Sequence, residues 1–182
     1  MTKRRRKTKN TLIIGLISLL IAAAQQHGWL QLITKQAEQS QPGLYTVVNF
    51  VDGDTIAVDM DGVTEKVRLI GVDTPETHDP RKTVQCFGQA ASSYTRQLIG
   101  NNKVRLEADS TNTNRDRYQR LLRYVYLPDG RLVNAEIIKN GYGFAYTYFP
   151  FTKLEDFKTY QTQAKDAQLG LWSNCDIEND FN

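Results

Sequence analysis

The sequence predicts an α+β domain, in which a five-stranded β-barrel of the oligonucleotide-binding (OB) type carries three packed helices. Two observations lead to this fold class. Short runs of β-branched and aromatic residues, separated by turn residues, indicate strands joined largely by hairpins. A helical pattern interrupts these strands between the third and the fourth. Five strands in this order are typical of a small closed barrel.

The five strands are expected where apolar residues alternate or run between turn signals. The second and third flank Asp61-Gly62, a dipeptide typical of a two-residue hairpin turn. The fifth ends at the turn formed by residues 128–130, Pro-Asp-Gly. The expected strands span residues 45–51, 55–60, 65–72, 103–108 and 120–127.

Three helices are expected around the barrel. In the first, apolar residues recur at three- and four-residue spacing from Phe87 to Leu98, and Gly100 closes the helix. A short second helix over residues 134–139 stops at Gly141. The third, over residues 153–168, presents its apolar residues on one side.

The N-terminus has the anatomy of an export signal. Residues 1–24 contain six Lys or Arg and no acid, and the apolar stretch from Thr11 ends in three alanines at Ala24. This stretch is shorter than the ~20 residues of a membrane span, but apolar character resumes at residues 29–33. A cleaved signal peptide and a retained membrane anchor therefore both stay open. A buried helix is less favoured, because the cations suit a cytoplasmic flank.

We accordingly expect an extracytoplasmic protein that is secreted or tethered to the membrane by residues 1–24. Residues 25–43 are expected to be a polar linker, residues 44–174 the folded domain, and residues 175–182 a C-terminal tail. We expect a monomer.

The net charge of +3 is not evidence for a polyanionic partner. It includes the six cations of residues 1–24, so the rest of the chain carries a net charge of −3. Any binding of nucleic acid must use a local basic patch, and the cluster of arginines between Arg115 and Arg123 is the candidate.

The chain has two cysteines, Cys86 and Cys175. Export permits a disulfide, which we favour over two independent thiols. His27 and His78 are isolated from each other and from the cysteines, so a zinc site is not expected.

The most informative stretch is Arg-Leu-Ile-Gly-Val-Asp-Thr-Pro-Glu-Thr, residues 68–77. Pro75 restricts its own φ and favours an extended Thr74, so Asp73 and Glu76 are expected on a stiff corner. A corner with two carboxylates beside Arg68 suits a metal ion together with a phosphate.

With two further motifs, this stretch resembles the staphylococcal nuclease (thermonuclease) family. The resemblance rests on Asp-Gly-Asp-Thr at 52–55, Val-Arg-Leu-x-Gly-Val-Asp-Thr-Pro-Glu at 67–76 and Asp-Arg-Tyr-x-Arg at 116–120. It extends from about residue 45 to residue 172. Each motif alone is a weak signal, but the three in this order are specific. The resemblance implies the same barrel and an exported, calcium-dependent nuclease of low sequence specificity, which cleaves DNA and RNA and leaves 3′-phosphate ends.

The resemblance also implies a metal site. Asp54 and Asp73 match positions that bind Ca²⁺, and the backbone carbonyl of Thr74 is a further ligand. Hard oxygen ligands without a soft partner favour Ca²⁺ or Mg²⁺ over transition metals. The alternative for Asp54 is an ordinary turn residue, whereas Asp52 is expected to form the turn rather than to bind the ion.

Three residues match catalytic positions of that family. Glu76 matches the general base, and Arg68 and Arg120 match the arginines that hold the phosphate. A guanidinium can donate two parallel N–H bonds to phosphate oxygens, which lysine cannot. Glu76 could instead be a solvent-exposed glutamate. Arg68 could form a structural ion pair, and Arg120 could belong to a solvated basic face.

Four residues match substrate-binding positions: Arg117, Tyr118, Tyr146 and Tyr148. Stacking on tyrosine tolerates any base, which fits low sequence preference. They could instead be ordinary aromatics at the barrel edge.

Gln119 departs from the family, which often has glycine here. Positive φ would strain glutamine by about 1–2 kcal/mol, and we expect Gln119 in the β region instead. Two competing functions remain: a non-catalytic nucleic-acid-binding module on the same barrel, and a membrane-tethered structural protein. The retained acids and arginines favour the enzyme over the module.

Overall fold

The computed structural model describes residues 43–77 and 84–181. The expected leader over residues 1–24, and the linker apart from Gly43, lie outside the described residues.

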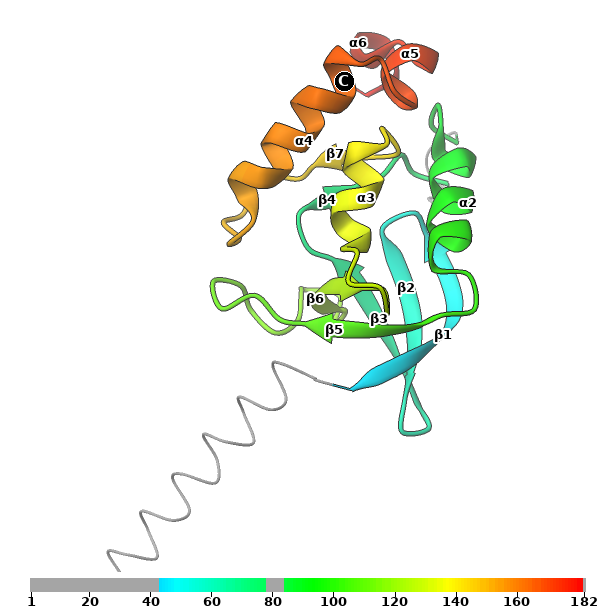
Figure 1. Ribbon diagram of the computed structural model, residues 1–182, viewed down its shortest axis with the longest axis vertical. Coiled ribbons are helices and arrows are strands. Elements are labelled where there is room, and N and C mark those ends of the chain that lie inside the picture. The colour runs from blue at the N-terminus through cyan, green and yellow to red at the C-terminus, as the bar shows by residue number, and fades with distance from the viewer. Residues whose placement is uncertain (1–42, 78–83, 182) are drawn as a thin grey trace, which may run out of the picture. The chain divides into compact units, whose positions relative to one another are not determined.

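The predicted fold class is confirmed, because the domain contains a closed five-stranded barrel with helices packed on it (Figure 1). The strand order around the barrel is β1-β2-β3-β6-β5. Neighbouring strands are antiparallel except β3 and β6, whose parallel pairing places Arg68 beside Leu122. The strands are β1 (Leu44–Asp52), β2 (Thr55–Met60), β3 (Val63–Leu69), β5 (Lys103–Glu107) and β6 (Leu121–Tyr126).

The hairpin between β2 and β3 forms at the predicted turn. Asp61 has a φ of 54° and Gly62 a φ of 86°. Positive φ at both central residues is what a type I′ turn requires, and Asp-Gly meets that requirement with little strain.

The third strand is shorter than expected. It was predicted to continue to Val72, but β3 ends at Leu69, and Gly71 follows with a φ of 72°. A side chain at Gly71 would place its Cβ 2.6 Å from the ring of Phe151, so only glycine fits. The chain then forms a separate two-residue strand, β4 (Val72–Asp73), which pairs with β7 (Phe144–Ala145). This break carries Asp73 out of the barrel and into the candidate site.

The helices cover one end of the barrel. The three predicted helices correspond to α2 (Gly88–Ile99), α3 (Val133–Lys139) and α4 (Leu154–Asp166), and α3 packs against both of the others (Figure 1). Two four-residue helices, α5 (Leu171–Asn174) and α6 (Ile177–Asp180), were not predicted, since so few residues show no periodicity. The expected tail at residues 175–182 therefore includes α6.

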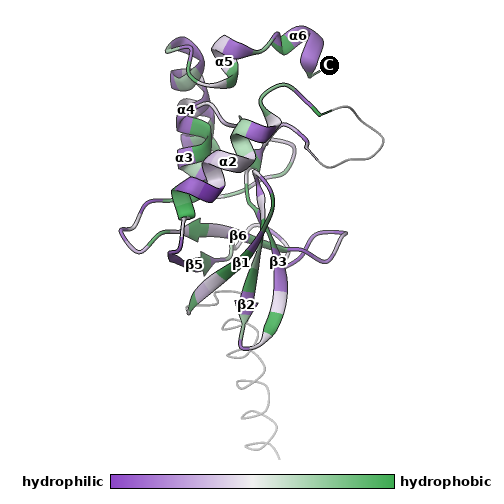
Figure 2. Cartoon of the chain, turned by 90° about the vertical axis from the view of Figure 1, so that its right-hand side faces the viewer, coloured by the Kyte–Doolittle hydropathy of each residue, from purple (hydrophilic) through white to green (hydrophobic). Residues whose placement is uncertain are grey.

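The core lies inside the barrel and under the helices. Figure 2 shows hydrophobic and hydrophilic residues alternating along the elements. Fully buried apolar side chains come from the strands and from α2, α3 and α4, and include Ile56, Val67, Ile99, Ile137 and Phe157.

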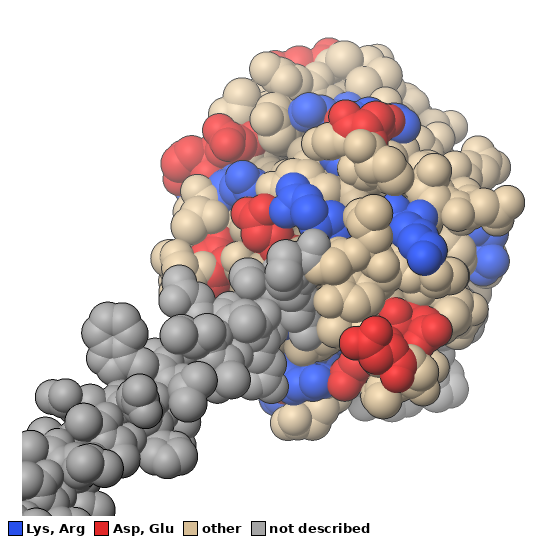
Figure 3. All heavy atoms as spheres, turned by 60° about the horizontal axis from the view of Figure 1, so that its bottom comes forward, with Lys and Arg blue, Asp and Glu red and all other residues tan. Residues whose placement is uncertain are grey.

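Acidic and basic side chains are mixed on the face shown in Figure 3. That mixture agrees with the modest net charge of the domain. Within residues 43–77 and 84–181, the structure has no helix with the length and apolarity needed to cross a bilayer.

Candidate active site

Arg68 is the centre of the candidate site. It lies near the end of β3, and its side chain is only 14% exposed. One terminal nitrogen, Nη2, lies 3.1 Å from Asp54 Oδ2 and 3.1 Å from Asp73 Oδ1. The other, Nη1, donates to the carbonyl oxygens of Leu69 and Val72. The guanidinium is thus held between the two predicted metal ligands.

Asp54 is buried in the turn between β1 and β2, and both of its carboxylate oxygens accept hydrogen bonds. Oδ2 accepts hydrogen bonds from the backbone N–H of Thr74 (3.0 Å) and from its hydroxyl (3.2 Å). Oδ1 accepts from the Thr55 hydroxyl at 2.9 Å. Buried carboxylates need such donors. Two of these bonds join Asp54 to Thr74, which lies twenty positions later in the sequence. Asp54 therefore connects its own turn to the corner at Thr74.

Asp52 behaves as the turn residue that we expected, with Oδ1 accepting from the backbone N–H of Gly53 at 3.0 Å. The same oxygen accepts from the Thr77 hydroxyl at 3.0 Å. Burial, the negative charge of Asp54 and a hydrogen bond with Glu76 raise the pKa of Asp52 to about 6. Asp52, Asp54 and Glu76 therefore lie close enough for their charges to interact.

Glu76 extends the corner after Pro75. Its Oε1 accepts from the backbone N–H of Thr77 at 3.0 Å. The main chain of Glu76 also forms two hydrogen bonds with Gln85, which lies three positions before α2. The predicted general base is therefore held through its main chain as well as through its carboxylate.

The carboxylates of Asp54 and Asp73 fit a hard cation. Both direct an oxygen at the same positively charged nitrogen of Arg68, so they already face a common positive charge. Carboxylate oxygens are the ligands that Ca²⁺ and Mg²⁺ prefer. With Thr74 beside them, they supply part of a coordination shell, and water or phosphate would have to complete it.

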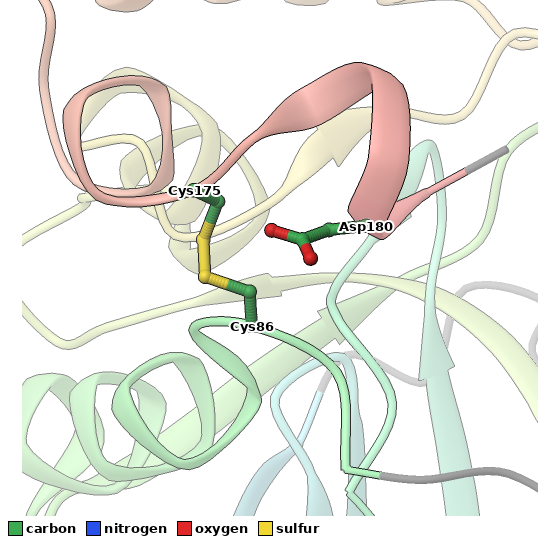
Figure 4. Close-up of side chains that lie close together, drawn as sticks. All are labelled: Cys86, Cys175 and Asp180. Carbon is green, nitrogen blue, oxygen red and sulfur yellow. A yellow bond between two sulfur atoms is a disulfide. The ribbon is translucent and has the colours of Figure 1, made fainter.

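A second group of possible ligands does not fit a metal. Across the described ranges, only Cys86, Cys175 and Asp180 form a set of three with ligand atoms within 4.8 Å of one another (Figure 4). The two cysteines, which we expected to pair, form a disulfide with a Cα–Cα distance of 5.9 Å. Their sulfurs are therefore not available as thiolate ligands.

A cleft of about 480 Å³ opens beside Arg68 and Asp73. One wall is the loop between β5 and β6, which contributes polar and basic side chains: Asn112, Thr113, Arg115, Asp116, Arg117, Tyr118 and Arg120. A second wall is aromatic and follows β7: Tyr146, Phe149 and Phe151. Asp54 and Glu76 do not line this cleft. The predicted catalytic groups thus divide between the cleft and the corner behind it, with Arg68 and Asp73 belonging to both.

Arg120 reaches the cleft because Asp116 organises the loop before β6. Asp116 Oδ1 accepts from the backbone N–H groups of Tyr118 and Arg120, both at 2.9 Å. Asp116 Oδ2 accepts from Arg120 Nε at 2.7 Å. The guanidinium groups of Arg117 and Arg120 lie 4.7 and 5.3 Å from the centre of the Tyr118 ring. Stacked and paired in this way, the two arginines are preorganised for an anion.

The expectation for Gln119 was wrong. Its φ is 63°, in the left-handed region, rather than in the β region. The tight turn explains the conformation, because Gln119 donates its backbone N–H to Asp116 O at 3.0 Å while Asp116 receives the neighbouring N–H groups. The position therefore favours glycine, and glutamine is strained there.

Tyr146 and Tyr148 lie together, with ring centroids 5.2 Å apart, but only Tyr146 lines the cleft. Tyr148 is 84% exposed. Phe149, which was not predicted, also lines the cleft: it is exposed, and its ring centroid is 6.1 Å from that of Tyr146. The aromatic density of residues 146–151, Tyr-Thr-Tyr-Phe-Pro-Phe, was the available signal. Asp116 opens the Asp-Arg-Tyr-x-Arg motif at 116–120, but it was assigned no role, because its contacts in the turn depend on the folded backbone.

Comparisons with known proteins show which family the sequence is similar to. The family model described as staphylococcal nuclease homologue matches residues 66–174. The chain is 36% identical over 177 residues to a thermonuclease of Staphylococcus hyicus, covering 93% of this chain and 99% of that protein. It is 43% identical over 129 residues to a thermonuclease of Staphylococcus intermedius, covering 70% and 75%. It is 41% identical over 130 residues to the endonuclease YncB of Bacillus subtilis, covering 70% and 61%.

Proposed function

Because the chain belongs to the staphylococcal nuclease family, it is a nuclease that hydrolyses nucleic acids, and we propose that it does so as an exported, calcium-dependent enzyme of low sequence specificity. Its substrates are DNA and RNA, and its products carry 3′-phosphate ends. One observation carries the proposal: Arg68 lies between the carboxylates of Asp54 and Asp73, beside a cleft with arginines on one wall and aromatic rings on the other.

The arrangement meets the chemical demands of phosphodiester hydrolysis. Arg68 and Arg120 bind the oxygens of the scissile phosphate and neutralise the charge that develops on them. Asp54, Asp73 and the carbonyl of Thr74 would hold a hard cation, which when bound would supply Lewis-acid polarisation of the phosphate.

Glu76 takes a proton from the attacking water, whose oxygen bonds to phosphorus. The bond from phosphorus to O5′ breaks and O5′ takes up a proton from solvent, so one product keeps the 3′-phosphate and the other gains a 5′-hydroxyl. The ordered corner that holds Glu76 supports this role, since its backbone and its side chain both have hydrogen-bond partners. Glu76 then needs little reorganisation to act.

The two walls bind the rest of the nucleotide. Arg117 and Tyr118 contact a neighbouring phosphate and base, and Tyr146 stacks on a base in the cleft. Tyr148, whose ring packs beside that of Tyr146 but does not line the cleft, stacks on a base at its edge. Arginine and aromatic side chains around one cleft suit the alternation of phosphate and base in a strand. Because stacking reads no base edges, the proposed enzyme has little sequence preference.

Export is proposed from the sequence of residues 1–24. The disulfide between Cys86 and Cys175 supports it, since such bonds persist in oxidising compartments. Mass spectrometry of the protein from its host would identify the mature N-terminus. A mature protein with free thiols in the cytoplasm would overturn the proposal of export.

The enzymatic proposal is tested by digestion of plasmid DNA and of RNA with calcium or with a chelator, followed by analysis of the ends. Arg68→Ala, Arg120→Ala and Glu76→Gln are each expected to lower kcat by about 100-fold or more while the fold survives. Arg105→Ala is the matched control, because Arg105 is a half-exposed arginine that pairs with Glu107 on β5, outside the cleft. Tight binding without cleavage, or full activity of folded Arg68→Ala, would contradict the proposal.

A further inference from the structure

The main chain of Glu76 is paired on both sides with one residue, Gln85. The backbone N–H of Glu76 donates to the side-chain oxygen Oε1 of Gln85 at 2.7 Å. The backbone N–H of Gln85 donates in return to the carbonyl oxygen of Glu76 at 3.0 Å. A glutamine side chain therefore completes a two-bond contact between residues that are nine positions apart.

The start of α2 packs against the corner formed by Glu76 and Thr77. Gly88, the first residue of α2, is buried, and a Cβ added to it would lie 2.8 Å from Thr77 Cγ2 and 3.0 Å from the carbonyl oxygen of Glu76. Contacts under 3.0 Å force a shift, so the absence of a side chain lets α2 begin directly against the corner.

The segment from Gln85 to Gly88 is itself firmly held. Cys86 is bonded to Cys175 near the C-terminal end of the domain (Figure 4). Phe87 has a φ of 68°, a conformation that a bulky residue adopts only when its surroundings impose it. Its ring packs against that of Tyr142, with centroids 5.3 Å apart. The partner of Glu76 is thus an anchored element.

We propose that Gln85 is a positioning residue for the nuclease reaction, which fixes the main chain of Glu76 so that its carboxylate is held at the reacting water; this inference rests on the proposed role of Glu76. The side chain of Gln85 acts only through Glu76. Because a displacement of about 1 Å can lower a rate by up to about 100-fold, loss of one backbone anchor is sufficient to slow the reaction.

The experiment compares Gln85→Ala with Gln89→Ala in the full chain, using single-stranded DNA and calcium. Gln89 is an exposed glutamine of α2 and the matched control. Gln85→Ala is expected to lower kcat by roughly 10- to 100-fold with KM within about twofold, because the anchor acts on the base and not on substrate binding.

Gln85→Glu retains an acceptor oxygen and is expected to recover most of the kcat. Gly88→Ala, whose new Cβ displaces the corner, is expected to lower kcat as well.

Two controls separate this role from a contribution to folding. Melting temperatures show that each variant is folded at the assay temperature; folded Gln85→Ala with wild-type kcat would overturn the proposal. In a Glu76→Gln background, Gln85→Ala is expected to have almost no further effect, since both changes act on one group. Wild-type activity of Glu76→Gln itself would overturn the role of Glu76, and the inference about Gln85 with it.

Discussion

Gln119 adopts an unfavourable backbone conformation directly beside Arg120, for which we propose a catalytic role. Its φ of 63° is imposed by the turn that Asp116 closes, and the next residue, Arg120, depends on that turn for its direction. Glutamine at positive φ costs about 1–2 kcal/mol relative to an allowed conformation. The strain affects stability, whereas the direction of Arg120 is set by Asp116.

Gln119→Gly is expected to stabilise the protein by about 0.5–1 kcal/mol. Relief of the strain is partly offset by the greater freedom of glycine in the unfolded chain. Urea unfolding measures the change, and kcat is expected to stay the same. Ser93→Gly, at an exposed position in the middle of α2, provides the contrast, because glycine inside a helix lowers stability by about 0.5–1 kcal/mol. A destabilised Gln119→Gly protein would show that the side chain of Gln119 has contacts that compensate the strain.

Phe149 adds an aromatic ring to the cleft beside the predicted Tyr146. Phe149→Ala is expected to raise KM for single-stranded DNA by about 5- to 100-fold, because stacking contributes about 1–3 kcal/mol per base. The control is Val63→Ala, which truncates an exposed apolar residue of β3, outside the cleft. An unchanged KM in steady-state kinetics would show that no base stacks on Phe149.

At the scale of elements, Asp109 joins the two walls of the cleft. Its carboxylate, in the loop after β5, accepts from the backbone N–H and the hydroxyl of Thr111 at 2.8 and 2.6 Å. It also accepts a hydrogen bond from the hydroxyl of Tyr124 on β6. A further hydrogen bond, of 2.6 Å, comes from the backbone N–H of Thr152, just before α4. The basic wall and the aromatic wall thus share one buried acceptor.

Asp109→Asn is expected to lower the free energy of unfolding by about 1–3 kcal/mol at pH 7. Burial alone would raise the pKa of Asp109, but hydrogen bonds from Thr111, Tyr124 and Thr152 outweigh burial and hold the pKa well below its usual value. The stabilisation is therefore complete above about pH 4, the pKa of an unfolded aspartate, and is lost as the pH falls towards the folded pKa.

Urea unfolding from pH 7 down to pH 3 tests this linkage. The difference between wild type and Asp109→Asn is expected to shrink below about pH 4. Asp61→Asn is the control, since it removes an exposed carboxylate from a turn that asparagine also suits. A difference that stays constant with pH would contradict the assignment to the carboxylate of Asp109.

At the scale of the whole domain, the disulfide connects the start of the α2 region to the C-terminal helices. Cys86 and Cys175 are 89 residues apart in the sequence. A crosslink over so long a loop removes much of the conformational freedom of the unfolded chain. It also anchors the segment that contacts Glu76, so the same bond acts on stability and on the site.

The double variant Cys86→Ser/Cys175→Ser is expected to lose up to about 4–5 kcal/mol of stability, as the chain-entropy model gives for a loop of this length. Urea unfolding at pH 7 measures the loss. Wild-type protein unfolded in a reducing agent is the control and is expected to match the variant. Equal stability of the oxidised wild type and the variant would show that the bond does not constrain the unfolded state.

The sequence by itself determined the barrel class, the three main helices, the Asp61-Gly62 hairpin and the family motifs. These follow from short-range patterns: periodicity, turn residues and residues at fixed spacing. Such patterns work because the backbone geometry of strands, helices and turns is largely local.

Only the tertiary structure decided the break of β3 at Gly71, the reach of Asp54 to Thr74, the left-handed backbone of Gln119, and the contact between Gln85 and Glu76. Each depends on a partner that packing brings close: the ring of Phe151 at Gly71, or a hydrogen bond from another element. Periodicity and spacing carry no information about which distant groups will meet, so these features could be read only from the folded chain.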